Sequence, residues 1–92
     1  MLVRFETDPE LSLRGKGLLI VCKELIARGI NPNVANIKPF GLDAERSITS
    51  GLHELTHLGY YKATKYRLAD RRGFDWKFEV SETREIPDEA VN

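Results

Sequence analysis

The string most suggestive of chemistry is His53-Glu54-Leu55-Thr56-His57, which has the spacing His-Glu-x-x-His. Two histidines four residues apart share one face of a helix, so both can bind a Zn²⁺ ion while the glutamate acts as a general base. This chemistry is that of a zinc metalloprotease. The string therefore raises the question of whether the sequence contains the other parts of such a site.

A catalytic zinc site needs a third protein ligand, and the sequence offers no convincing one. The acidic candidates, Glu79, Glu82 and Glu85, lie at a predicted strand end or in a predicted loose tail, not on an evident helix. A chain of 92 residues also leaves little protein to build a substrate cleft. We therefore expect no catalysis, no bound metal and no cofactor, with a small zinc metalloprotease as the less favoured alternative.

Charge is distributed unevenly along the chain. The 14 Lys and Arg residues balance 14 Asp and Glu residues, which gives a formal net charge of zero. Residues 59–78 nevertheless carry six cations and two acids, whereas residues 79–92 carry one cation and five acids. A local excess of positive charge is what an anion-binding surface needs, so the neutral average does not exclude a nucleic-acid partner.

Three helices are expected before residue 60. They cover residues 13–28, 34–38 and 44–58. Ser12, Asn33 and Asp43 are suitable N-caps for them, because their side-chain oxygens accept hydrogen bonds from the free N–H groups of a first helical turn. Pro39 is expected to stop the second helix, because its ring clashes with the preceding turn and it has no N–H.

The spacing of apolar residues becomes alternating after the third helix. The apolar positions near the end of the chain are Phe74, Trp76, Phe78 and Val80. Their alternation with polar residues predicts a strand with one buried face. Trp76, like Tyr60, Tyr61 and Tyr66, could stack on bases, but we expect Trp76 to pack in the core. Residues 60–68 are the predicted partner strand and residues 69–73 the hairpin loop. A short strand over residues 2–5 is expected before the helices.

This order of elements predicts an α+β winged helix-turn-helix fold. It has a three-helix core and a C-terminal β-hairpin wing. We expect residues 1–80 to form one domain. Residues 81–92 are rich in acids and poor in apolar groups, which favours an acidic, flexible tail.

Several segments resemble winged helix domains of phage and plasmid replication proteins and of primosome-type replisome organisers. The resemblance runs from the Leu-Ser-Leu opening at Leu11 to the wing at about residue 80, and Ile48 to Tyr60 is similar to the third helix of those domains. Arg67 and Gly73 fit their wing. The sequence departs from the pattern at Pro39, which shortens the second helix, and at Thr49, where a basic residue is common.

The resemblance implies double-stranded DNA binding without catalysis, in phage or plasmid replication or in transcription regulation. The recognition helix, about residues 43–58, would enter the major groove, and the wing, about residues 60–80, would hold the backbone. The implied groove residues are Arg46, Ser47, Thr49, Ser50 and His53. The implied phosphate-binding residues are Lys65, Arg67, Arg71 and Arg72.

A winged helix used for protein–protein interaction is the main alternative, because one fold serves unrelated functions. A homodimer or a replication or transcription protein is an expected partner, since a monomer of this size has a limited DNA-binding surface. No run of residues is apolar enough to predict a membrane span. Cys22 is the only cysteine and lies in an apolar run, which predicts a buried thiol and a reducing, cytoplasmic setting.

Overall fold

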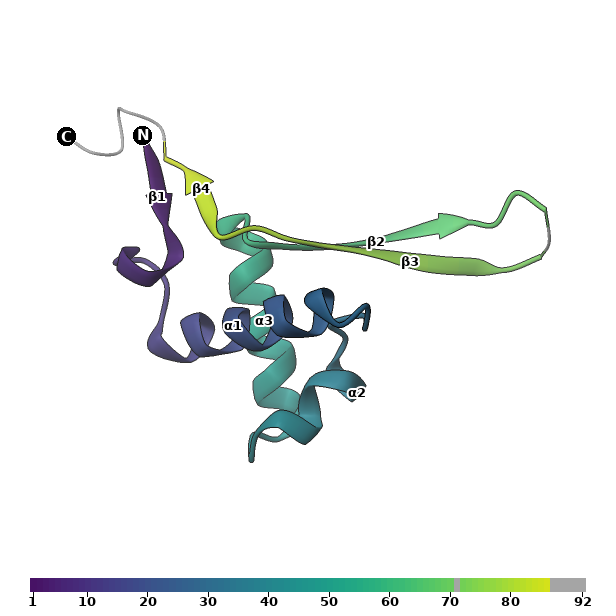
Figure 1. The fold of residues 1–92 in the computed structure, drawn as a ribbon, viewed down its shortest axis with the longest axis horizontal. Coiled ribbons are helices and arrows are strands. Elements are labelled where there is room, and N and C mark those ends of the chain that lie inside the picture. Colours follow the sequence, from purple (N-terminus) through teal and green to yellow (C-terminus); the bar gives the residue numbers. More distant parts are fainter. Residues whose placement is uncertain (71, 87–92) are drawn as a thin grey trace.

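The computed structural model describes residues 1–70 and 72–86. The elements in chain order are β1 (Leu2–Arg4), the 3₁₀ helix η1 (Phe5–Thr7), α1 (Leu13–Ala27), α2 (Val34–Ile37), the 3₁₀ helix η2 (Lys38–Phe40), α3 (Glu45–Leu58), β2 (Tyr61–Arg67), β3 (Phe74–Val80) and β4 (Thr83–Glu85). The prediction of an α+β fold with three helices followed by a C-terminal β-hairpin is confirmed (Figure 1). The topology is consistent with a winged helix-turn-helix.

The core lies where α1 and α3 cross. Leu19, Leu25 and Leu55 are almost completely buried there, together with Cys22. A Cβ atom at Gly51 would stand 2.6 Å from a methyl carbon of Leu18, so this glycine allows the two helices to approach closely. The buried thiol of Cys22 is confirmed, and burial raises its pKa to about 12.

The helix ends follow local signals in the sequence, with one exception. The side chains of Ser12 and Asn33 accept the capping hydrogen bonds of α1 and α2, as predicted. The α-helical path of α2 ends at Ile37, before Pro39, as predicted, and Pro39 fits the first turn of η2, where a missing N–H costs no hydrogen bond. The prediction for Asp43 is wrong, because Ala44 is the N-cap of α3 and makes no side-chain cap.

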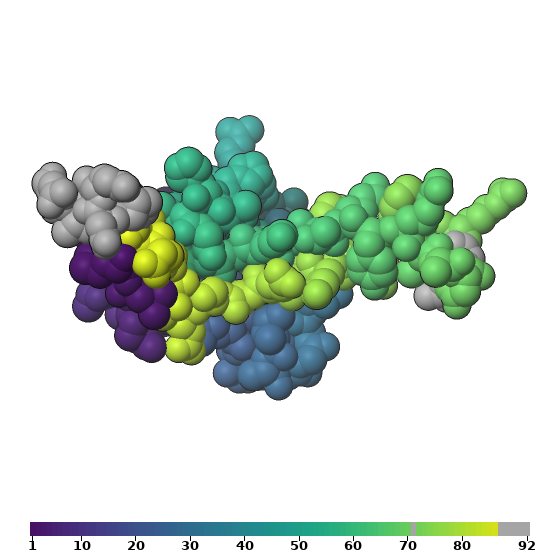
Figure 2. Space-filling view, turned by 90° about the horizontal axis from the view of Figure 1, so that it is seen from above, coloured from purple at the N-terminus to yellow at the C-terminus, as the bar shows by residue number. Residues whose placement is uncertain are grey.

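The hairpin of β2 and β3, called the wing from here on, extends away from the helices. Gly59 ends α3 in the left-handed conformation, and Tyr60 is buried as the chain turns into β2. The two strands pair in antiparallel register from Tyr61 opposite Val80 to Arg67 opposite Phe74. The molecule measures 50 × 33 × 23 Å, and Figure 2 shows the green wing protruding beyond the helices.

A second, smaller sheet joins the two ends of the described chain. β4 pairs antiparallel with β1, with Val3 opposite Arg84. The expectation of a loose tail from residue 81 is therefore wrong for residues 81–86, because these residues return to the N-terminal strand. Residues 87–92 of the predicted tail lie outside the described residues.

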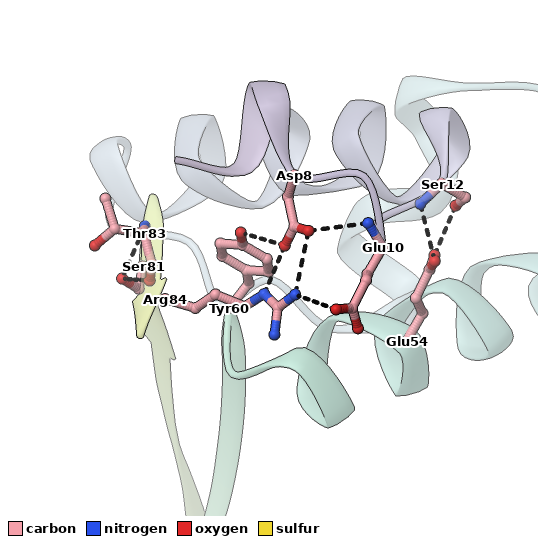
Figure 3. A network of polar contacts seen from close by, with 8 residues as sticks. All are labelled: Asp8, Glu10, Ser12, Glu54, Tyr60, Ser81, Thr83 and Arg84. Carbon is pink, nitrogen blue, oxygen red and sulfur yellow. Dashed lines mark hydrogen bonds and ion pairs between the residues drawn. The ribbon is translucent and has the colours of Figure 1, made fainter. Parts of the chain in front are cut away.

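A buried ion pair fastens this terminal sheet to the helices (Figure 3). Asp8 is completely buried and accepts hydrogen bonds from Arg84 at 2.6 and 3.1 Å and from the hydroxyl of Tyr60 at 2.8 Å. The hydrogen bonds from Arg84 lower the pKa of Asp8 to about 2. Burial, together with the hydrogen bond to Asp8, raises the pKa of Tyr60 to about 12.

None of the helices in residues 1–70 and 72–86 has the length and apolar character needed to cross a membrane.

Candidate functional site

The outward face of α3 carries most of the predicted groove residues. Arg46, Thr49, Ser50 and His53 are exposed, because the opposite face of the helix buries Ile48, Gly51, Leu52 and Leu55. Ser47 differs from them. It is half-buried and lines a cleft of about 270 Å³ between α1, η2 and the start of α3, so it faces the helices instead of the outward surface.

The first turn of α3 is less acidic than its sequence indicates. Glu45 forms an ion pair with Lys38 of η2, with 3.2 Å between Nζ and Oε1. Arg46, next to it, has no acidic partner among the residues that the structure describes. The positive charge of Arg46 is therefore available to an outside group.

Arg14 of α1 is a neighbour of this face that the sequence analysis missed. It lines a shallow depression together with Ser50 and Glu54 of α3. Its position at the start of α1 could be predicted, but its closeness to Ser50 depends on the angle at which α1 and α3 cross. Arg14 adds a second cation beside the outward face of α3.

The wing presents different chemistry on its two faces. Directly opposed residues of paired strands share a face, so Lys65 lies beside Trp76, and Arg67 lies beside Phe74. The other face of the wing carries Lys62, Thr64 and Tyr66 opposite Glu79, Lys77 and Asp75. The first face is thus aromatic and basic, whereas the second mixes both signs of charge.

The predicted burial of this strand holds only at the base of the wing. Phe78 and Val80 are half-buried, and Phe78 contacts Tyr61 with 6.2 Å between the ring centroids. The prediction that Trp76 packs in the core is wrong, since Trp76 is 48% exposed and Phe74 is 57% exposed. A strand of seven residues spans roughly 23 Å, so the outer half of the wing passes beyond the helices that could cover it.

The cations of the molecule fall into two classes. Those of the helical body and terminal sheet are mostly paired with acids: Arg4, Lys23, Arg28, Lys38 and Arg84. Within residues 1–70 and 72–86, Lys62, Lys65, Arg67 and Arg72 of the wing have no acidic partner, and Lys77 alone pairs there, with Glu79. Four of the five described wing cations are therefore unpaired, against three of the eight described cations elsewhere (Arg14, Lys16 and Arg46), so unpaired positive charge is more frequent on the wing.

The predicted site residues form two groups and not one continuous patch. Arg46, Thr49, Ser50 and His53 line α3, whereas Lys65, Arg67 and Arg72 lie in the outer half of the wing, which extends away from α3 (Figure 1). Arg71 lies outside the described residues. A rigid ligand that contacts both groups must therefore be large.

The His-Glu-x-x-His string lies on α3, but its parts face different ways. Both oxygens of Glu54 accept hydrogen bonds from Ser12, at 3.0 Å from the backbone N–H and 2.7 Å from the hydroxyl (Figure 3). His53 and His57 are exposed. In the part of the chain that the structure describes, no three His, Cys, Asp or Glu side chains converge to hold a metal. Glu54 thus has a structural contact that accounts for it.

No family model, curated protein or solved structure matches this chain.

Proposed function

We propose that the chain is a winged helix-turn-helix domain that binds double-stranded DNA through α3 and the wing. The observation that carries this proposal is the segregation of charge. Five of the eight described cations outside the wing are paired with acids, whereas four of the five described wing cations, together with Arg14, Lys16 and Arg46 of the body, have no such partner among the described residues. A polyanion is the partner that gains most from such a surface, because each phosphate neutralised releases counterions.

In this proposal α3 is the recognition helix. Its exposed residues are short donors with one long cation, which suits a helix lying in the major groove. Arg46 would contact guanine or a phosphate, while Thr49 and Ser50 would donate to phosphate oxygens. Arg14 would contact the backbone on the α1 side, and His53 would lie over the groove.

The wing would contact the DNA beside that groove. Lys65, Arg67 and Arg72 are exposed and reach beyond the helices, which suits a neighbouring backbone or the minor groove. Replication of a phage or plasmid and control of transcription are the two roles that this mode of binding would serve. A homodimer or a protein partner would extend the contact surface.

The test is a titration of fluorescently labelled duplex DNA at several salt concentrations. A DNA-binding surface of this kind loses affinity steeply with salt, by about 0.9 in the slope of log K against log salt for each phosphate neutralised. The paired substitution Arg67→Ala and Arg72→Ala should reduce the magnitude of the slope by roughly 1.8, if both contact phosphates.

The matched control removes two arginines that already pair with acids. Arg4→Ala and Arg28→Ala change the net charge equally, and both side chains are exposed, as those of Arg67 and Arg72 are. The control should leave the slope unchanged. Equal effects of the two pairs, or no duplex binding at low salt, would contradict the proposal and favour the interaction module that binds another protein.

A further inference from the structure

The outer half of one wing face combines aromatic rings with cations and has no acid. This surface, the aromatic–cationic face, consists of Lys65, Arg67, Phe74 and Trp76. The two acids of β3, Asp75 and Glu79, both lie on the opposite face. Strand register thus places the two acids of β3 on the face opposite Phe74 and Trp76.

The rings of this face are exposed in a way that a purely structural role does not require. Trp76 is 48% exposed and Phe74 is 57% exposed, although both residues occupy the apolar positions of their strand. The Nζ atom of Lys65 lies 4.6 Å from the ring centroid of Phe74, and the guanidinium carbon of Arg67 lies 6.0 Å from it. Cations therefore stand directly beside a flat apolar surface.

We propose that the aromatic–cationic face binds unpaired nucleotides, so that the chain prefers DNA in which a duplex adjoins a single strand. Exposed rings stack on bases of any sequence, and adjacent cations contact the phosphates. The absence of acids from this face favours an anionic partner, and the rings favour one that offers flat groups. Unpaired nucleotides have both features, whereas duplex DNA buries its base faces. This inference rests on the proposed function for the duplex part.

The spacing of the two rings suits an extended single strand of DNA. Phe74 and Trp76 are two residues apart on one strand, about 7 Å. Stacked bases in a duplex rise by roughly 3.4 Å, which is half of that distance. Each ring can therefore take one base of an extended strand. The contact of Lys65 with Phe74 is exposed and hence weak, so a base can displace the ammonium group to a phosphate.

A groove continues this face toward the helical body. It has a volume of about 440 Å³ and lies between the wing, with Trp76 and Phe78, and Asn31, Asn33 and Val34 of the body, and Asp75 is the one acid in its lining. Trp76 therefore lies where the aromatic–cationic face meets this groove, which the single-stranded DNA could enter.

The experiment compares three labelled probes: a blunt duplex, the same duplex with a single-stranded oligo(dT) extension, and oligo(dT) alone. Binding is followed by anisotropy of the label and, for the wild-type chain, by tryptophan fluorescence. Trp76 is the only tryptophan in the sequence, so stacking of a base on it should quench the signal directly. The extension should raise affinity about tenfold and quench the fluorescence.

Three variants separate the face from the rest of the wing. Phe74→Ala and Trp76→Ala should each remove most of the tenfold gain while leaving blunt-duplex binding within about twofold. Tyr66→Ala is the matched control, because Tyr66 is a similarly exposed ring (44%) on the opposite face of the same hairpin. It should leave affinity for all three probes unchanged, and circular dichroism should show that the variants are folded.

The outcomes distinguish this inference from the proposed function. If the blunt duplex binds and the extension adds neither affinity nor quenching, the inference fails and the proposed function stands. If only the extended probe and oligo(dT) bind, the binding of unpaired nucleotides by this face stands, while duplex binding, and with it the preference for a junction, fails. If no probe binds, both fail. If Tyr66→Ala abolished the affinity gained from the single-stranded extension as fully as Phe74→Ala, the assignment of nucleotide binding to the aromatic–cationic face would also be wrong.

Discussion

The described residues form two small antiparallel sheets that use charge in opposite ways. In the terminal sheet, Arg84 of β4 is held by the buried carboxylate of Asp8, and Arg4 of β1 pairs with Glu6 and Glu82. In the wing, Lys65 and Arg67 have no acidic partner among the described residues and stand in solvent. One sheet uses its arginines to close the fold, and the other leaves them available.

This difference shows that counting cations does not identify a binding surface. Arg84 and Arg67 are the same residue type on strands, yet the side chain of Arg84 is 12% exposed and its guanidinium pairs with Asp8, whereas Arg67 is exposed. Only Arg67 can exchange its water and counterions for a ligand without loss of a contact that holds the fold together. Substitutions in the two sheets should therefore have effects of different size on different properties.

The largest effect is expected from Asp8→Ala in the terminal sheet. It would leave the guanidinium of Arg84 nearly buried, with Glu10 at 3.5 Å as its remaining acidic partner, and would remove the carboxylate that the hydroxyl of Tyr60 donates to. Breaking a buried ion pair from one side costs about 3–5 kcal/mol, so urea unfolding should show a large loss of stability. Arg67→Ala should change stability by less than about 0.5 kcal/mol. Equal losses would contradict the comparison.

A smaller effect of the same ion pair should appear as a dependence of stability on pH. The pKa of Asp8 is about 2 in the folded chain, below its ordinary value of 3.8. The folded state therefore binds this proton less readily than the unfolded state, and the stability gained is complete above pH 4. About 2 kcal/mol should be lost as the pH falls from 4 through 2.

The comparison that isolates this loss uses Asp8→Asn, which cannot titrate. The difference in unfolding free energy between wild type and variant should shrink between pH 5 and pH 2. Other carboxylates titrate equally in both chains, so they cancel. A constant difference over this range would show that the Asp8 carboxylate does not stabilise the fold through its charge.

The next effect tests the decrease in side-chain burial from the base of the wing to its outer half. Phe78 at the base is half-buried against Tyr61, so Phe78→Ala should cost roughly 1–2 kcal/mol of stability, part of the value for a fully buried side chain. Phe74→Ala, on the same face of the same strand, should cost less than about 0.5 kcal/mol because the ring is in solvent. Urea denaturation of the two variants measures the difference, and equal losses would mean that the outer wing is covered.

The helical part of the fold is predictable because its signals are local. Ser12 and Asn33 act on the first turn that follows them, and Gly59 supplies the left-handed residue that ends α3. The prediction for Asp43 failed by one residue, because the chain enters α3 at Ala44 and the side chain of Asp43 makes no cap.

The predictions for the terminal sheet and for the outer half of the wing are wrong because both features depend on contacts between residues far apart in the sequence. The alternation of apolar residues around Trp76 identifies one apolar face of the strand, but it does not show whether another element covers that face. The helices do not extend as far as the outer half of the hairpin. The pairing of β1 with β4 joins residues about 80 positions apart, which no local pattern reveals. The one signal available was Arg84, a single cation inside an acidic segment, whose partner Asp8 lies at the other end of the chain.

The smallest effect distinguishes the two faces of the wing with one residue type. Lys65 lies on the aromatic–cationic face without an acidic partner in the described chain, whereas Lys77 lies on the opposite face and pairs with Glu79 at 3.3 Å. Lys65→Ala should reduce the magnitude of the salt slope of DNA binding by about 0.9, the value for one phosphate, and Lys77→Ala by much less. Both should leave stability within about 0.5 kcal/mol, because exposed charges contribute little to folding. If Lys77→Ala changed the slope as much as Lys65→Ala, DNA would contact both faces equally, and the separation of the wing into a binding face and a neutral face would be wrong.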